Sequence, residues 1–252
     1  MKIVRTRPTR KLAALAVAAL ALLPACIPSG PPGPNPPTGD GDGFARTSAS
    51  YQRLRAQGYG LSVEYAPPSD LRMSLLRQRL DPVLNGAAYQ LDFHTGLDFP
   101  GVNSLFHGAF SDAAPTGTIT VSIVTAAEMA AIGCPGANVV GCGGVSTASG
   151  NRVLSGRIAI LDEHIVQASD LVLSTTVMHE LGHALNLAHY NSLYGGELQT
   201  MHSGGGSHSG DYRSGDKNGL KWMAAGSLEP DAQARAGAPG DGEIVIVHDV
   251  LP

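Results

Sequence analysis

Short stretches in which hydrophobic and polar residues alternate predict the strands of this chain. Leu61–Tyr65, Thr118–Thr125 and Gly156–Asp162 alternate or are rich in β-branched residues, which is typical of strands. Glu243–Val247 has a similar pattern and is either a last short strand or part of a tail without regular structure. Gly143–Ser155 is a run of small and polar residues to which we assign no element.

Hydrophobic residues at helical spacing predict three helices. The first begins at Asp70, and Pro82 is expected to break or end it because proline lacks the backbone N–H of a helix interior. The second covers Leu171–Leu185 and the third covers Asp216–Met223. Residues suited to cap the first turns of these helices are Ser69, Ser169 or Asp170, and Ser214.

Strands and helices in this order predict an α+β domain. The chain has 252 residues and 43% hydrophobic residues, enough for one domain of about 200 residues with its own core plus extensions. We expect a targeting segment at residues 1–25, a linker at 26–43 and the folded domain at 44–252, with its core between about 60 and 225.

The first residues have the pattern of an export signal. Five basic residues precede Leu12–Leu23, an apolar run too short to span a membrane comfortably. The next residues, Leu23-Pro24-Ala25-Cys26, resemble a bacterial lipoprotein cleavage box in which Cys26 takes the lipid, although Pro24 is atypical there. Ordinary signal-peptide cleavage and an uncleaved anchor are the alternatives, and all three predict export to the membrane surface or the exterior. The Pro/Gly-rich linker would then hold the domain away from a lipid surface.

The charge of the exported part disfavours polyanionic partners. Without the five basic residues, 12 Lys and Arg face 21 Asp and Glu, a net charge of about −9. A surface of this sign argues against nucleic acid and anionic membrane surfaces as partners.

Two cysteines bracket a turn-rich loop. If Cys26 is lipidated, Cys134 and Cys142 form the remaining pair. In an exported chain this pair predicts a disulfide. A zinc site built on only two cysteines and a catalytic thiol are the less favoured alternatives.

The candidate chemistry lies in His179-Glu180-Leu181-Gly182-His183 and in His189, six residues later. On a helix His179 and His183 share one face, so both imidazoles can bind one Zn²⁺, and a third ligand leaves a coordination position for water. By chance, this three-histidine pattern would arise in roughly one of several thousand such chains. For His189 to reach the metal the chain must turn sharply, and Asn186 tolerates the left-handed conformation that such a turn requires.

Two other interpretations of these residues are open. The stretch could be an ordinary core helix with surface histidines. Alternatively the third ligand could be Glu197, as in zinc enzymes that use a downstream carboxylate, although Tyr194–Glu197 has no helical pattern.

These motifs resemble the metzincin metallopeptidases, and most closely their matrixin branch. The elongated motif is His179 to His189, Met201 stands where that clan has its methionine turn, and Asp216–Lys221 is similar to the start of the matrixin C-terminal helix. The chain departs from matrixins in lacking the cysteine-switch propeptide and the histidine–aspartate pattern of a structural zinc. Ser203 stands where some metzincins place a tyrosine, and only the position of Asp40 or Asp42 suggests a substitute for the propeptide.

The resemblance implies a metzincin-like fold and a zinc endopeptidase. That fold has a mixed twisted sheet, an active-site helix, a second long helix and a C-terminal helix after the methionine turn. One Zn²⁺ would bind His179, His183 and His189, with Glu180 as general base and Met201 beneath the site.

A peptide or protein substrate would lie along Gly156–Leu161 as an added strand, and we expect a monomer. The alternative function is an exported zinc-binding lipoprotein without proteolytic activity. An additional Ca²⁺ or Zn²⁺ site around His94 and His107, with Asp92 and Asp98, has no diagnostic spacing. Residues Tyr89–Phe110 are therefore expected to form a long loop.

Overall fold

The computed structural model describes residues 42–65, 70–106, 113–134, 139–204, 209–228 and 245–249. The predicted targeting segment with Cys26, most of the linker with Asp40, and His107 lie outside the described residues. Within the described part, none of the helices combines the length and the hydrophobicity needed to span a membrane.

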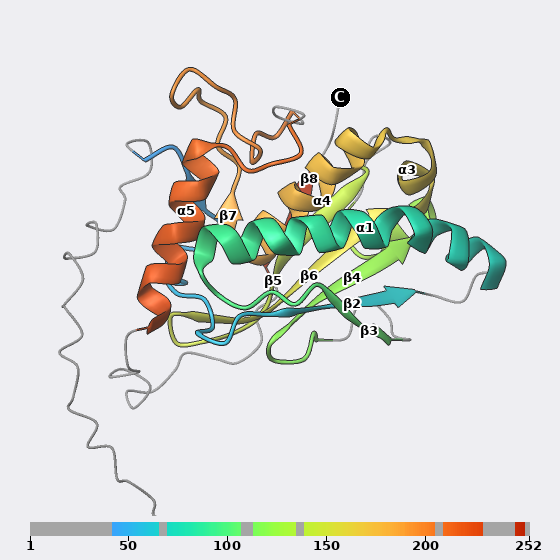
Figure 1. The fold of residues 1–252 in the computed structure, drawn as a ribbon, viewed down its shortest axis with the longest axis horizontal. Helices are drawn as coiled ribbons and strands as arrows, with labels where there is room; N and C mark the ends of the chain where they lie inside the picture. Colours follow the sequence, from blue (N-terminus) through green and yellow to red (C-terminus); the bar gives the residue numbers. More distant parts are fainter. Residues whose placement is uncertain are drawn as a thin grey trace, which may run out of the picture. The chain divides into compact units, whose positions relative to one another are not determined.

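The described strands form one mixed sheet of six and one small pair (Figure 1). The sheet has the order β3-β2-β4-β6-β5-β8, in which β2, β3, β4 and β6 are parallel and β5 is antiparallel to both neighbours. The strands of the sheet are β2 (Gly60–Tyr65), β3 (Val102–Phe106), β4 (Thr118–Val124), β5 (Gly141–Ser149), β6 (Arg152–Leu161) and β8 (Val245–Asp249). The pair consists of β1 (Ala45–Arg46) and β7 (Leu187–Ala188).

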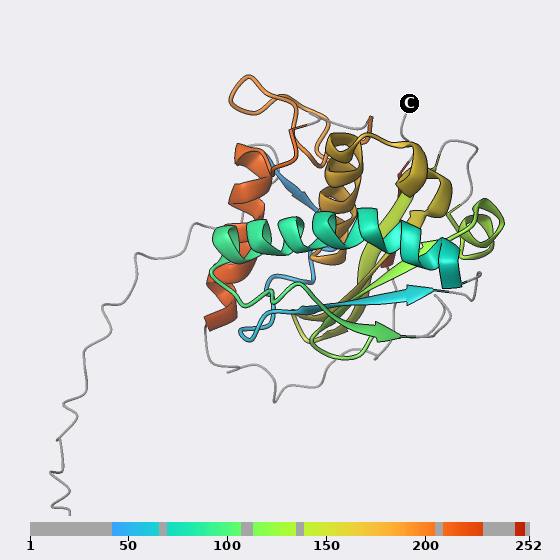
Figure 2. The same cartoon turned by 45° about the vertical axis from the view of Figure 1, so that its right-hand side comes forward.

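Helices complete an α+β fold, as the sequence predicts. They are α1 (Asp70–Thr95), α2 (Ala126–Ala131), α3 (Asp162–Gln167), α4 (Asp170–Ala184) and α5 (Ser214–Ala225), followed by the 3₁₀ turn η1 (Gly226–Leu228). Figures 1 and 2 show α1 running across the sheet, with α4 behind it and α5 at one end. The main core joins the sheet, α1, α4 and α5 through buried aliphatic side chains.

Helix α1 is longer than the sequence predicts, because Pro82 does not end it. Leu80, Leu84 and Leu91 are fully buried on one side of the helix, on both sides of the proline. Each buried leucine contributes about 1.5–3 kcal/mol, which offsets the roughly 3 kcal/mol cost of an interior proline. Pro82 itself is exposed, so its ring meets no core side chain.

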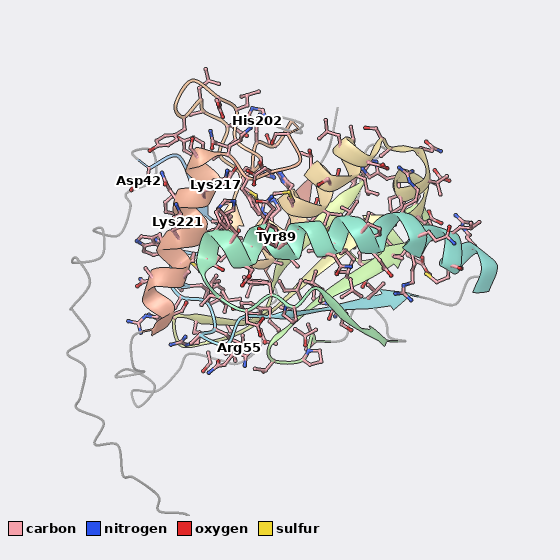
Figure 3. The ribbon with its side chains drawn as sticks, viewed as in Figure 1. Asp42, Arg55, Tyr89, His202, Lys217 and Lys221 are labelled. Carbon is pink, nitrogen blue, oxygen red and sulfur yellow. A yellow bond between two sulfur atoms is a disulfide. The ribbon has the colours of Figure 1, made fainter. Side chains whose placement is uncertain are left out.

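The region after Pro82 also differs from the prediction. Residues Tyr89–Thr95 belong to α1, and Val102–Phe106 forms β3, so the predicted long loop at Tyr89–Phe110 is wrong for the part that the structure describes. Tyr89 lies on the outer side of the helix with 66% of its surface exposed (Figure 3).

The run of small residues to which we assign no element from the sequence forms a β-hairpin. Strand β5 pairs with β6 across a turn at Gly150-Asn151, in which Gly150 has a φ of 58°. A Gly-Asn dipeptide between two runs is a known hairpin signal, so the sequence did contain it. Strand β6 therefore lies between β4 and β5, and the prediction that Gly156–Leu161 is an exposed strand is wrong.

The predicted disulfide is present. Cys134, which follows α2, is bonded to Cys142 in β5, and both cysteines are buried in a second, smaller core cluster. The bond thus connects the loop after α2 to the first residues of β5.

We expect Pro82→Ala to stabilise the domain. Alanine restores the missing N–H donor in the middle of α1 and has the best helix propensity, so the free energy of unfolding should rise by about 1–3 kcal/mol. Urea denaturation followed by circular dichroism measures this change. Ser74→Ala, an exposed change on the same helix, is the control, and a Pro82→Ala variant no more stable than that control would contradict the prediction.

Candidate metal centre

Helix α4 places the first two histidines. Ser169 caps it, as its hydroxyl oxygen accepts a hydrogen bond from the N–H of Val172 at 3.3 Å, and the helix ends at Ala184. His179 and His183 lie on one face with their ring centroids 4.7 Å apart. The local sequence is sufficient for this part of the site.

Asn186 makes the turn that brings back the third histidine, as the sequence predicts. Its φ is 74°, and it is the one non-glycine residue with positive φ in the described part of the chain. Its side-chain amide donates to the carbonyl oxygens of Ser48 and Tyr51, both at 2.9 Å, and its Oδ1 accepts from the N–H of Ser48 at 2.9 Å. The two residues of β7 then pair with β1 and lead to His189.

The three imidazoles converge on one point. Nε2 of His183 lies 3.0 Å from Nε2 of His179 and 3.2 Å from Nε2 of His189. Zinc–nitrogen bonds of 2.0–2.1 Å in a tetrahedron place neighbouring nitrogens about 3.3 Å apart, close to this spacing. Among the described residues, His179, His183 and His189 form the group of side chains that could hold a metal ion.

Backbone carbonyls fix which nitrogen faces the centre. Nδ1 of His179 donates to the carbonyl of Thr200 at 2.6 Å, and Nδ1 of His183 donates to the carbonyl of Leu187 at 2.7 Å. Because a carbonyl oxygen only accepts, Nδ1 carries a proton in both rings, and when the rings are neutral each Nε2 keeps its lone pair. Two such lone pairs 3.0 Å apart repel each other, and a cation bound between them would stabilise the arrangement. The donor set therefore fits a metal ion that prefers imidazole ligands, such as Zn²⁺.

The side chain of Glu180 fills the space between α4, to which the residue belongs, and strand β5. Only 1% of the surface of Glu180 is exposed. A Cβ atom built on Gly141 would lie 2.3 Å from its Oε1, and one built on Gly143 would lie 2.5 Å from its carbonyl oxygen. These two glycines allow the close approach that sets the position of the carboxylate. Sequence reasoning missed them because they lie in the strand that it did not predict.

Met201 packs beneath the motif helix. It is buried, and a Cβ built on Gly182 would lie 2.4 Å from its sulfur atom. The absence of a side chain at Gly182, between the two helical histidines, thus provides the space that this thioether fills.

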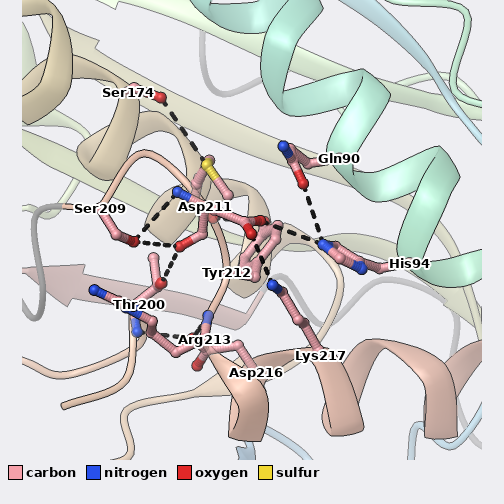
Figure 4. A network of polar contacts seen from close by, with 11 residues as sticks. Gln90, His94, Ser174, Thr200, Ser209, Asp211, Tyr212, Arg213, Asp216 and Lys217 are labelled. Carbon is pink, nitrogen blue, oxygen red and sulfur yellow. Dashed lines mark hydrogen bonds and ion pairs between the residues drawn. The ribbon is translucent and has the colours of Figure 1, made fainter. Parts of the chain in front are cut away.

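Asp216 holds the segment around Met201 (Figure 4). Its carboxylate accepts hydrogen bonds from the N–H groups of Thr200 at 2.7 Å, Arg213 at 3.0 Å and Met201 at 3.3 Å. Burial raises the pKa of this carboxyl, and the N–H donors act in the opposite direction. Since the carbonyl of Thr200 accepts from His179, Asp216 orients that ligand indirectly. The sequence assigned Asp216 only to a helix, which begins two residues earlier than expected, at Ser214.

A second polar cluster ties α1 and α5 to the same segment. The Asp211 carboxylate lies 2.7 Å from Nζ of Lys217 and 3.3 Å from Nε2 of His94, and its carbonyl accepts from the Thr200 hydroxyl at 3.0 Å. Burial lowers the pKa of His94. His94 thus belongs to the support of the site, and the structure groups neither it nor Asp92 and Asp98 as metal ligands.

The rival third ligand lies elsewhere. Glu197 follows a turn at Gly195 and Gly196, its side chain is 52% exposed, and its carboxylate lies 3.3 Å from Arg213. It is not part of the histidine group. The interpretation that Glu197 completes the site is therefore wrong, and His189 takes that place.

Two further residues are not part of the histidine group. His164 of α3, a histidine close to the motif helix, contacts the hydroxyl of Thr176 in α4 at 3.0 Å. The carbonyl of Asp42 accepts from the side chain of Asn218 at 3.0 Å, which places it beside α5 (Figure 3).

Comparison with models of known protein families and with curated proteins finds no match for this chain.

Substitution of Asn186 should separate the two roles of this residue. Asn186→Gly keeps the left-handed turn but loses three side-chain hydrogen bonds, so zinc affinity should fall about 10–100-fold, as for other residues that support ligands. Asn186→Ala also strains the backbone and should fall further. Competition with a chromophoric chelator measures both affinities. Native zinc affinity in the alanine variant would refute this account of the turn.

Proposed function

We propose that this chain is a zinc-dependent endopeptidase of the metzincin type, most similar to matrixins. The observation that carries the proposal is the convergence of three Nε2 atoms, with the buried carboxylate of Glu180 on the same turn of α4. His179, His183 and His189 would hold the ion. Bound zinc supplies a Lewis acid that acidifies a water molecule and polarises a peptide carbonyl.

In this proposal Glu180 performs the proton transfers. Its carboxylate accepts the proton of the attacking water and passes it to the amine that leaves. Gly141 and Gly143 hold the carboxylate in place, and the carbonyls of Thr200 and Leu187 keep two histidines oriented. Met201 packs beneath the ligands without binding the ion.

The ligand number favours an enzyme over the alternative, an exported zinc-binding protein without proteolytic activity. Structural zinc sites are usually closed by four protein ligands, and the described residues supply three. A purely structural site also has no use for a carboxylate beside the ligands. Export through the N-terminal segment, with or without a lipid on Cys26, is part of the same proposal and rests on the sequence pattern alone.

Hydrolysis of casein or gelatin by the purified protein is the first test. We expect a chelator to abolish it and Glu180→Gln to lower it by about 10²–10⁴-fold while zinc stays bound, because the amide cannot accept the proton. Glu197→Gln is the matched control and should keep both zinc and activity. The proposal would be refuted by a zinc-loaded native protein that cleaves no member of a peptide library.

Gly141→Ala should uncouple activity from metal binding. The new Cβ would displace the Glu180 carboxylate, a side chain that can move, so hydrolysis should fall at least about tenfold with zinc retained. Gly86→Ala, at a position of α1 with nothing within 4 Å, is the control and should leave activity unchanged. Full activity in Gly141→Ala would show that the close approach of β5 does not position the carboxylate.

A further inference from the structure

Strand β5 has a neighbour that comes from a distant part of the chain. On one side it pairs with β6, and on the other it pairs antiparallel with β8. The register places Gly141 opposite Asp249, Gly143 opposite Val247 and Val145 opposite Val245. Segment β8 thus covers the edge that β5 would otherwise expose.

That edge lies next to Glu180. Gly156 of β6 packs against Ala184 of α4, whereas Gly141 and Gly143 of β5 pack against Glu180, one turn earlier in the helix. Strand β5 therefore lies closer to the Glu180 carboxylate than β6 does. Strand β8 follows β5 in the order of the sheet, on the side away from β6. Neighbouring strands lie about 4.8 Å apart, so the backbone of β8 runs one strand away from the glycines that contact Glu180.

An edge of this kind is a general binding surface for extended peptides. A peptide that adds to a sheet edge is held by main-chain hydrogen bonds, which any sequence can make. In this chain Val245–Asp249 already binds β5 in this way.

We infer that Val245–Asp249 is an internal competitor of the substrate, because it occupies the edge of β5 along which the proposed peptidase would bind an extended peptide. This inference rests on the proposed function and replaces the sequence-based prediction that Gly156–Leu161 binds the substrate. A peptide would bind antiparallel to β5 after β8 has left. A tethered segment has an effective concentration on the order of millimolar, so it competes strongly with dilute peptides.

Binding of a labelled peptide tests the inference without any hydrolysis. The probe is a fluorescein-labelled synthetic peptide with the sequence of residues 243–250, and the protein is the full chain with Glu180→Gln. Leu161 donates to the carbonyl of Val140 across β6 and β5. Gly143, three residues further on than Val140, therefore faces β8, and the N–H of its register partner Val247 donates to β5. Proline has no N–H for the ladder, so Val247→Pro should release β8, whereas Ile246→Pro removes an N–H that faces away from β5. We expect Val247→Pro to bind the peptide at least about tenfold more tightly than the parent, the effect of losing about one backbone hydrogen bond.

Val247→Ile, which keeps the N–H and the β-branched side chain, is the matched control and should bind the peptide like the parent. The melting temperature shows whether Val247→Pro remains folded. Equal peptide affinity in folded Val247→Pro and in the parent would overturn the inference and would make β8 a permanent strand of the sheet.

A reversible lock provides the second test. Gly144 and Ile246 are register partners, so Gly144→Cys with Ile246→Cys allows a disulfide that holds β8 on β5. The oxidised protein should lose peptide binding and regain it on reduction, whereas the parent treated with the same reductant controls for the native disulfide. An oxidised lock that binds the peptide as well as its reduced form would contradict the inference.

Activity assays separate this inference from the proposed function. With Glu180 intact, Val247→Pro should hydrolyse casein about tenfold faster than the native chain at low substrate concentration. Tighter peptide binding without hydrolysis in any variant would refute the peptidase and keep the assignment of the edge. Native hydrolysis that Val247→Pro leaves unchanged would refute the competitor and keep the peptidase.

Discussion

The close packing of α4 on the sheet is the constraint on which the site depends. Glycines at three sheet positions let the helix approach until its backbone and the Glu180 side chain meet the strands directly. A side chain at Gly143 or Gly156 would meet the backbone of α4 and push the helix outward together with His179 and His183, whereas one at Gly141 would displace the Glu180 side chain. Gly182 allows the same closeness on another side of the helix, where Met201 fills the space. The helix is thus held between a glycine-lined sheet and a single thioether.

Hydrogen bonds from residues that surround the histidines fix the orientation of the rings. Asp216 fixes the backbone of Thr200, and the carbonyl of Thr200 fixes the ring of His179. Asp211 connects the same segment to α1 and α5. The orientation of the His179 ring therefore depends on Asp216, a residue two contacts away from it.

The sequence predicts those parts of the molecule that local patterns determine. The histidine spacing, the turn at Asn186 and the disulfide follow from short stretches, and the structure bears them out. Of the two caps that the sequence leaves open for α4, Ser169 and Asp170, the structure has Ser169, whereas the predicted cap Ser214 is the first residue of α5. The continuation of α1 through Pro82 was missed because buried leucines on both sides outweigh the local preference of proline. The role of the β5 glycines and that of Asp216 were missed for another reason. Gly141 and Gly143 contact Glu180 of α4. Asp216 of α5 binds the N–H groups of Thr200 and Met201. These contacts join separate elements, so no pattern within one element records them.

The side-chain hydrogen bonds of Asn186 have a consequence for how the domain folds. Its partners Ser48 and Tyr51 lie 138 and 135 residues earlier in the chain. The position of His189 therefore depends on a contact between residues that are very far apart in the sequence. The motif helix alone carries two histidines and cannot complete the site. If the proposed zinc binds there, its binding is linked to folding, because the three histidines converge only in the folded domain, and free zinc at a hundred times its Kd would add about 2.7 kcal/mol to stability. Binding of the ion would then report that the segment of Ser48 and Tyr51 has packed on the turn at Asn186.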